Sequence, residues 1–158
     1  MIVGLENLAD IRSQHANQKI VLTSGTFDLL HVGHLRYLNA VKALGDVVVV
    51  MLSGDDRVKA RKGPQRPIIP EDDRAQLLDA LKVVDYVFID PASSVPEQTD
   101  PVHAEIVAKL QPDVYATDGP DPRFWNSMEE SKLVILPRSG GDGHASTSAI
   151  IEHIVNQN

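Results

Sequence analysis

The sequence predicts an α/β fold in which a five-stranded parallel sheet carries helices on both faces. Two observations lead to this prediction: short, β-branched apolar segments alternate with segments of helical periodicity, and the 158 residues have the size of one domain. Strand and helix in alternation are typical of a parallel sheet with right-handed crossovers. We therefore expect one domain, residues 1–158, either as the whole protein or as part of a larger one.

Five segments have the composition of strands that are buried on both faces. Apolar and mostly β-branched residues dominate each of them, and turn or helical signals separate one from the next. In chain order the segments are residues 19–24, 46–53, 84–90, 112–117 and 132–137.

Helices are predicted between the strands, over residues 33–44, 71–81, 103–110 and 146–155. The first has the clearest pattern: Leu35, Leu38, Val41 and Leu44 recur at helical spacing, and Gly45 follows as an end signal. We expect that apolar face to pack on the sheet.

Composition excludes several classes of function. The net charge of −7 opposes non-specific binding to nucleic acid, and the absence of cysteine excludes disulfides and thiolate zinc sites. No apolar segment approaches the ~20 residues that span a bilayer, and residues 1–14 lack the basic start of a signal peptide. We expect a cytoplasmic protein that binds neither nucleic acid nor membranes.

The segment GTFDLLHVGH, residues 25–34, joins the first strand to the first helix. Gly25 permits a sharp turn there, and Gly33 allows a ligand to approach the backbone where N–H groups and the helix dipole favour phosphate. His31 and His34 are three residues apart, so both imidazoles can reach the same anionic group. The segment predicts an anion site; the alternative is a polar turn with incidental histidines.

Two further segments are suited to phosphate. Lys59, Arg61, Lys62 and Arg66 fall within eight positions of a predicted loop after the second strand, where they can reach the same site or form a solvated face. Near the C-terminus, Ser146 precedes a helical pattern as a cap and follows the glycine-rich residues 140–143, which suggests a second phosphate cradle.

Residues 25–34 resemble the HxGH signature of the nucleotidyltransferase superfamily, the cytidylyltransferase-like and adenylyltransferase enzymes with a Rossmann-like fold. The resemblance implies that His31 and His34 contact a triphosphate and stabilise charge as pyrophosphate leaves. It also implies that Thr26 and Phe27 line the nucleotide pocket with their backbone and that Asp28 secures the turn.

Residues 62–87 are similar to heptose-phosphate adenylyltransferases and archaeal FAD synthetases. This similarity implies that a lysine, Lys62 in preference to Lys59, touches the phosphates. Arg74 stands at the position of the family's helix arginine, with a salt bridge to a nearby carboxylate as the alternative.

The C-terminal segment resembles the family's RTxGxSTS/T signature. By that resemblance Ser146 and Thr147 hold the β- and γ-phosphates, and Arg138 matches the signature arginine of the cytidylyltransferases. His31, His34, Lys62 and Arg138 are therefore the predicted catalytic residues.

One segment departs from the family pattern. Relatives usually carry a Gly-Asp pair after the fourth strand, whereas this chain has Asp118 followed by Gly119, which we still assign to the nucleotide site. Arg123 and Trp125 follow, either to close on a small anionic acceptor or to pack under a loop.

The predicted reaction moves a nucleoside monophosphate from a nucleoside triphosphate to a phosphate or phosphonate oxygen of a small acceptor, with release of pyrophosphate. Arg138 favours CTP as the donor, and ATP is the alternative. The resemblance implies Mg²⁺ held by the nucleotide phosphates, without a protein cage of its own. We also expect a homodimer. A nicotinamide-dependent oxidoreductase is disfavoured because GxGxxG is missing from the first turn, whereas a non-catalytic nucleotide-binding domain stays open.

Overall fold

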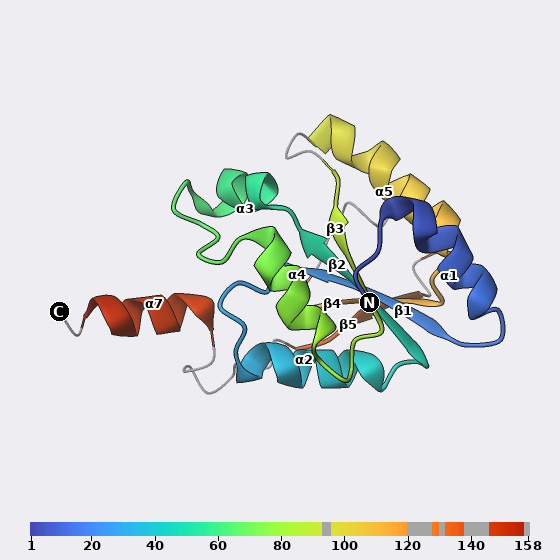
Figure 1. Cartoon of the computed structure of the whole chain (residues 1–158), viewed down its shortest axis with the longest axis horizontal. Helices are drawn as coiled ribbons and strands as arrows, with labels where there is room; N and C mark the ends of the chain where they lie inside the picture. The colour runs from blue at the N-terminus through green and yellow to red at the C-terminus, as the bar shows by residue number, and fades with distance from the viewer. Residues whose placement is uncertain (93–95, 120–127, 130–131, 138–145, 157–158) are drawn as a thin grey trace.

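The computed structural model describes residues 1–92, 96–119, 128–129, 132–137 and 146–156 (Figure 1). Its centre is a sheet of five strands in the order β3-β2-β1-β4-β5, and all neighbouring strands pair in parallel. The predicted five-stranded parallel sheet is confirmed. The strands are β1 (Ile20–Gly25), β2 (Val47–Ser53), β3 (Tyr86–Asp90), β4 (Val114–Thr117) and β5 (Leu133–Ile135).

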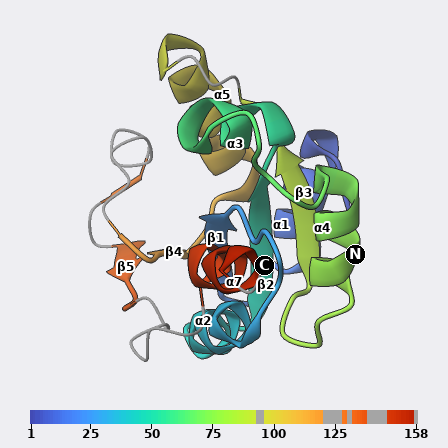
Figure 2. The same ribbon diagram turned by 90° about the vertical axis from the view of Figure 1, so that its left-hand side faces the viewer.

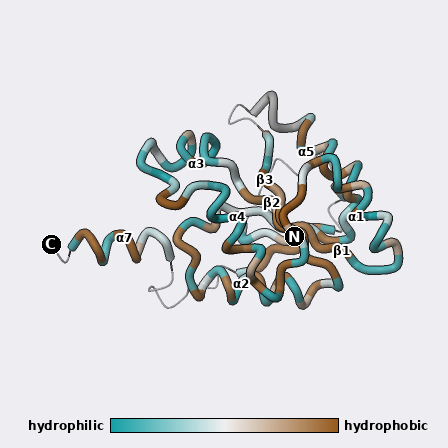
Figure 3. Tube along the Cα trace, in the orientation of Figure 1, coloured by the Kyte–Doolittle hydropathy of each residue, from teal (hydrophilic) through white to brown (hydrophobic). Residues whose placement is uncertain are grey.

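Helices cover both faces of this sheet, as predicted. Alternate residues of β2 point to opposite sides: Val48 and Val50 pack with α2 (Val32–Lys42) and α4 (Glu71–Asp79), whereas Val47 and Val49 pack with α1 (Leu8–Gln14) and α5 (Pro96–Leu110). The strands form the most hydrophobic part of the chain (Figure 3). Because each face of β2 is buried, its apolar run shows no alternation in the sequence.

The order of the strands fixes where a ligand can enter. The chain passes from β1 to β2 and β3 on one side, then crosses to β4 and β5 on the other side. The order in which strands are added to the sheet therefore reverses between β1 and β4. Open α/β sheets bind ligands at such a point, outside the carboxyl ends of the strands. Figure 2 looks at the molecule with α7 (Thr147–Val155) in front and with β5 and β3 at opposite ends of the sheet.

The first predicted helix is present, but its buried face is different. Gly33, Tyr37, Leu38 and Val41 are buried in α2, whereas Leu35 is 40% exposed. The prediction for Leu35 was wrong: the side of α2 that faces the sheet carries Tyr37, Leu38 and Val41, and the Tyr37 hydroxyl reaches Thr23 of β1.

The basic segment after β2 is a helix rather than the predicted loop. Residues Asp55–Lys62 form α3, with Asp55 and Asp56 in its first turn and Lys59, Arg61 and Lys62 in its last. Acidic residues at the start and basic residues at the end of a helix interact favourably with its macrodipole. These charges help to stabilise α3, which has no apolar stripe. Sequence periodicity could not reveal it, since only Arg57 and Val58 are buried in α3.

Other boundaries also differ from prediction. α5 begins at Pro96, with Pro101 inside it, rather than at residue 103, and α1 was not predicted. α7 begins one residue after its predicted start because Ser146 is the cap, and the helix projects from the body of the domain (Figure 1). Among the described residues, no helix is both long and apolar enough to cross a membrane.

Candidate active site

The two imidazoles of the segment 25–34 lie stacked at the start of α2. Their ring centroids are 3.9 Å apart and the ring planes differ by 26°. His31 is the N-cap of α2, and its side chain accepts a hydrogen bond from the Gly33 N–H (3.1 Å). His34 accepts from the backbone N–H of His31 (3.4 Å), so the two side chains form a reciprocal capping box.

These hydrogen bonds determine where each ring can donate. In both rings the accepting atom is Nδ1, so a neutral ring carries its proton on Nε2. The backbone of α2 thus fixes the tautomer of His31 and His34 and leaves each Nε2–H as a donor. Two neighbouring N–H donors suit the oxygen atoms of a phosphate. The N–H of buried Gly33, which we expected to face a ligand, is used to hold His31.

Both rings are held in the neutral form. The pKa of His34 is lowered to about 4, chiefly by burial and then by the neighbouring His31 and Lys62, against the opposing carboxylates of Asp28 and Asp118. Burial also lowers the pKa of His31 below its usual 6.5. At neutral pH the pair therefore acts as hydrogen-bond donors without a positive charge.

The loop between β1 and α2 is held in a conformation that few side chains adopt. Phe27 and Leu29 have φ angles of 48° and 47°, in the left-handed region. The Phe27 ring lies 5.3 Å from the His34 ring, and a Cβ at Gly25 would come within 2.7 Å of the Phe27 ring. Strain of this kind persists where the surrounding structure enforces it, and it is concentrated at functional sites.

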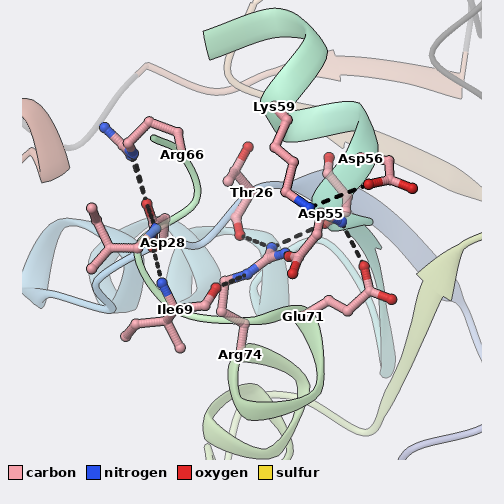
Figure 4. Close-up of polar contacts among 11 residues, drawn as sticks. Thr26, Asp28, Asp55, Asp56, Lys59, Arg66, Ile69, Glu71 and Arg74 are labelled. Carbon is pink, nitrogen blue, oxygen red and sulfur yellow. Dashed lines mark hydrogen bonds and ion pairs between the residues drawn. The ribbon is translucent and has the colours of Figure 1, made fainter. Parts of the chain in front are cut away.

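Asp28 supplies part of that enforcement. Its side chain is 1% exposed and accepts hydrogen bonds from Arg66 and from the backbone N–H groups of Ile68 and Ile69 (Figure 4). Burial raises the pKa of Asp28, but these donors outweigh that effect and hold the pKa below its usual value. The carboxylate thus secures the turn, as expected, by tying it to the segment between α3 and α4.

Arg74 ties the same loop to the start of α3. Its side chain is completely buried, and its guanidinium donates to the backbone carbonyls of Thr26 (2.6 Å), Ser53 (3.0 Å) and Ile69 (2.8 Å). It also pairs with Asp55 at 2.6 Å (Figure 4). The salt bridge that we kept as the alternative for Arg74 is therefore present.

The two candidate lysines of α3 have different surroundings. The ammonium of Lys59 lies 3.3 Å from the Asp56 carboxylate, at an exposed position. Lys62 lies close enough to His34 to lower the pKa of that ring. Of the two lysines, Lys62 is the one whose charge acts on His34, and its contact with the phosphates stays a prediction.

The second side of the site is built by β4 and α7. Thr147 donates from its hydroxyl to the Asp28 carbonyl (2.6 Å), and the Ser146 hydroxyl caps α7 by accepting from the Ala149 N–H (3.1 Å). After β4, the Thr117 hydroxyl donates to the Gly119 carbonyl (2.7 Å), and Asp118 acts electrostatically on His34. Arg123, Trp125 and Arg138 lie outside the described residues.

A buried hydroxyl network that we did not predict joins β1 to β4 beneath the site. The Thr23 hydroxyl and the Tyr37 hydroxyl lie 2.8 Å apart, and both reach the carbonyl of Ala116. Burial raises the pKa of Tyr37 to about 12. The polar Thr23 inside an apolar strand was the available signal of such a network. The sequence alone could not identify its partners, because they lie on two other elements, α2 and β4.

The described residues offer no dedicated metal cage. Within the parts of the chain that the structure describes, no three His, Asp or Glu side chains are grouped so that they could hold an ion.

A separate cavity of about 320 Å³ opens at the carboxyl ends of β2 and β3. Three of its lining side chains are carboxylates, so it is unsuited to a triphosphate. It is lined by Gly54, Asp55, Asp56, Arg57, Glu71, Pro91 and Ala92.

Residues 22–152 match the family described as Cytidylyltransferase-like. The chain belongs to this family. The match extends over the histidine loop, α3, β4 and most of α7, so the family is recognised over the whole arrangement described above. The resemblance to the nucleotidyltransferase superfamily is confirmed.

Two curated relatives show how this family member is related to others. The chain is 41% identical over 157 residues to the bifunctional protein HldE of Helicobacter pylori (strain G27), a match that covers 97% of this chain and 31% of that protein. It is 39% identical over 144 residues to the FAD synthase of Thermococcus onnurineus (strain NA1), covering 85% of this chain and 90% of that enzyme. The chain thus spans about a third of the HldE relative.

Solved structures support the fold. A lipopolysaccharide core biosynthesis protein from Thermoplasma volcanium GSS1 is 32% identical, with a TM-score of 0.50 over 63% of this chain and 73% of that chain. The pantoate-beta-alanine ligase of Francisella tularensis aligns with all of this chain and 78% of its own, with a TM-score of 0.60 and 16% identity. The second similarity concerns the fold alone.

Proposed function

We propose that this protein is an adenylyltransferase: an oxygen of an acceptor's phosphate or phosphonate attacks the α-phosphorus of ATP. The new oxygen–phosphorus bond forms as the bond to the α–β bridging oxygen breaks, and pyrophosphate leaves. The observation that carries this proposal is the stacked His31–His34 pair at the start of α2, with both Nε2–H groups available as donors.

ATP replaces the CTP that we favoured from the sequence. The preference for CTP depended on Arg138, which lies outside the described residues. FAD synthase, a relative with 39% identity, is named for a product that contains an adenosine monophosphate group. The similarity of residues 62–87 to adenylyltransferases favours the same donor, so the relatives support the alternative rather than the first choice.

The proposed role of the protein is to position the phosphates and stabilise the leaving group. His34 donates from Nε2 to the oxygen on which charge grows as pyrophosphate departs, and His31 holds a neighbouring oxygen. Lys62, at the end of α3, adds a positive charge beside His34. Preorganised donors aimed at developing charge need no reorganisation during the reaction, which lowers the barrier.

Ser146 completes the phosphate site in this proposal. The Ser146 oxygen accepts from the Ala149 N–H, so its O–H hydrogen is free to donate to a phosphate oxygen. Thr147, whose hydroxyl is bonded to the Asp28 carbonyl, instead fixes α7 to the histidine loop. Mg²⁺ bound to the phosphates would neutralise their charge when present.

A screen of pyrophosphate release tests the proposal. ATP, CTP, GTP and UTP are each combined with flavin mononucleotide, with a sugar phosphate such as a heptose 1-phosphate, and with a simple phosphonate. We expect turnover with ATP and at least one phosphorylated acceptor, and its loss in His34→Ala. Turnover with CTP alone would restore the cytidylyltransferase assignment. ATP binding by calorimetry without turnover by any combination would favour a non-catalytic nucleotide-binding domain.

We further propose a homodimer. α7 exposes apolar side chains, with Ile154 at 56% and Val155 at 65%, on a helix that projects from the domain (Figure 1). Apolar surface of this kind is typical of interaction sites. Light scattering on the purified chain, compared with Ile154→Ser, measures the oligomeric state directly; a monomer at micromolar concentration would contradict the proposal.

A further inference from the structure

Three polar links join the histidine loop to other parts of the domain. Asp28 is linked to Arg66 and the backbone that precedes α4, Thr147 is linked to the Asp28 carbonyl, and Arg74 is linked to the Thr26 carbonyl. Of the three, only Arg74 also reaches α3, through its ion pair with Asp55. It is therefore the residue that connects the element carrying His31 to the element carrying Lys62.

Arg74 has no exposed surface for a ligand. The side chain is 0% exposed, and three of its nitrogen atoms donate to four protein oxygens at 2.6–3.0 Å. A buried guanidinium is stable only where such partners compensate its lost hydration. The Arg74 guanidinium is oriented by two backbone carbonyls at strand ends: that of Thr26, after β1, and that of Ser53, at the end of β2.

The other described contacts within α3 also lie near its beginning. Arg57 and Val58 are its only buried residues, and Arg57 pairs with Asp90 of β3 at 3.0 Å. The Asp55 N–H donates to the Glu71 carboxylate. Figure 4 shows Arg74 between Thr26 and Asp55, with Glu71 on the other side of Asp55. Contacts made at the beginning of the helix thus bear on the position of Lys62, two turns further along α3.

We infer that Arg74 is a positioning residue that holds the histidine loop and the start of α3 in a fixed relation, so that Lys62 and His34 act on the same phosphate group. This inference rests on the proposed function and changes the role that the sequence suggested for Arg74. The nucleotide is not its ligand; its ligands are the Thr26 and Ser53 carbonyls and the Asp55 carboxylate. Its contribution to the reaction is exerted through Lys62.

A double-mutant cycle tests this role. Arg74→Lys keeps the charge but cannot reach four oxygens in a planar fork. We expect it to lower kcat at least tenfold, and we expect Lys62→Ala, made in that background, to lower kcat less than twofold further. Lys62→Ala in the parent should cost about tenfold or more. Equal effects of Lys62→Ala in both backgrounds, or an unchanged kcat in Arg74→Lys, would overturn the inference.

Arg12→Lys is the matched control. Arg12 also bonds the carbonyls of Gln111, His15 and Gln18 and pairs with Asp113 at 3.1 Å, but it lies on α1, away from the histidine loop. If replacing a multiply bonded arginine simply disturbs the structure, both Arg74→Lys and Arg12→Lys should show it. Non-additivity with Lys62→Ala should appear only with Arg74→Lys. The same non-additivity at Arg12 would overturn the inference.

Two measures keep the test decisive if Arg74→Lys does not fold or the proposed reaction fails. Asp55→Asn removes the negative charge, and with it the ion pair, at the α3 end of the link, from a side chain that is 25% exposed; the same cycle with Lys62→Ala applies to it. Independently of turnover, NMR titration of the His34 ring reports the approach of Lys62, because Lys62, His31, Asp28 and Asp118 all act on that ring. We expect the pKa of His34 to rise in Arg74→Lys or Asp55→Asn and to stay unchanged in Arg12→Lys. An unchanged pKa in folded Asp55→Asn would overturn the inference even where no pyrophosphate is released.

Discussion

The chemistry available to His31 and His34 follows from which nitrogen of each ring faces the backbone. Both Nδ1 atoms accept backbone N–H groups, so protonation of either ring breaks a hydrogen bond at the start of α2. This arrangement favours a neutral donor over an imidazolium. It also explains why the second histidine stands three residues after the first: position N3 of a helix faces the N-cap backbone.

His34→Ala should therefore stay folded and lose most of its turnover. Removing one preorganised donor costs about 10²–10³ in kcat. We expect ATP affinity within roughly tenfold of the parent, because the donor acts mainly on charge that develops in the transition state. Single-turnover kinetics and calorimetry separate the two quantities.

Leu35→Ala is the control for His34→Ala. It removes a neighbouring side chain that is 40% exposed and has no hydrogen-bonding group, so kcat should be unchanged. If His34→Ala unfolds the protein while its folded fraction retains the parent kcat, the histidine is structural and the proposed mechanism is wrong.

At the scale of elements, the sequence was most informative where burial imposed a pattern. All five strands were found within a few residues, because continuous apolar runs such as residues 47–52 identify strands that are covered on both faces. α3 was missed because its stability comes from charges matched to the helix dipole and from polar contacts of Asp55 and Arg57. These contacts join residues up to 33 positions apart, which no local pattern reports.

Substitution can distinguish the roles of the individual basic residues at the end of α3. Lys62→Ala should lower kcat/KM for ATP about tenfold or more, since a charged contact typically contributes about 1.5–3 kcal/mol. Its Tm should stay within about 2 °C of the parent, because an exposed lysine contributes little to folding. Pyrophosphate release and thermal unfolding measure the two effects.

Arg61→Ala provides the comparison at the adjacent position. Arg61 is exposed in the same last turn and makes the same favourable contribution against the helix dipole. We expect its kcat/KM to stay within twofold of the parent. Equal losses in both variants would mean that the general basic charge of α3 matters and that Lys62 has no specific place in the site.

At the scale of the whole molecule, a strand order of β3-β2-β1-β4-β5 brings three distant motifs to one edge. The histidine loop follows β1, Asp118 follows β4, and α7 returns to the Asp28 carbonyl across 119 residues of sequence. The motifs and their common edge could be predicted from the sequence. The links that fix them, Asp28 with Arg66 and Arg74 with Thr26, could not, because each partner is ordinary in its own segment.

The same site should make the stability of the fold depend on pH. In the unfolded chain a histidine has a pKa near 6.5, whereas His34 in the folded protein has a pKa of about 4. Between these values the unfolded state binds more protons, so stability present above pH 6.5 is lost as the pH falls towards 4. Below that range the lowered pKa of Asp28 acts in the same direction, since its contribution is present above its unfolded pKa and is lost in acid.

Urea unfolding at pH 7, 5.5 and 4.5 measures this dependence. We expect the free energy of unfolding of the parent to fall by an amount on the order of 1–2 kcal/mol that His34→Gln does not show, after allowance for solvent that reaches the partly exposed ring. Leu35→Ala, which changes an exposed neighbour without a titrating group, should keep the slope of the parent. If the slope of His34→Gln equals that of the parent, His34 titrates alike in both states, and the ring is then not held neutral by its burial beside His31 and Lys62.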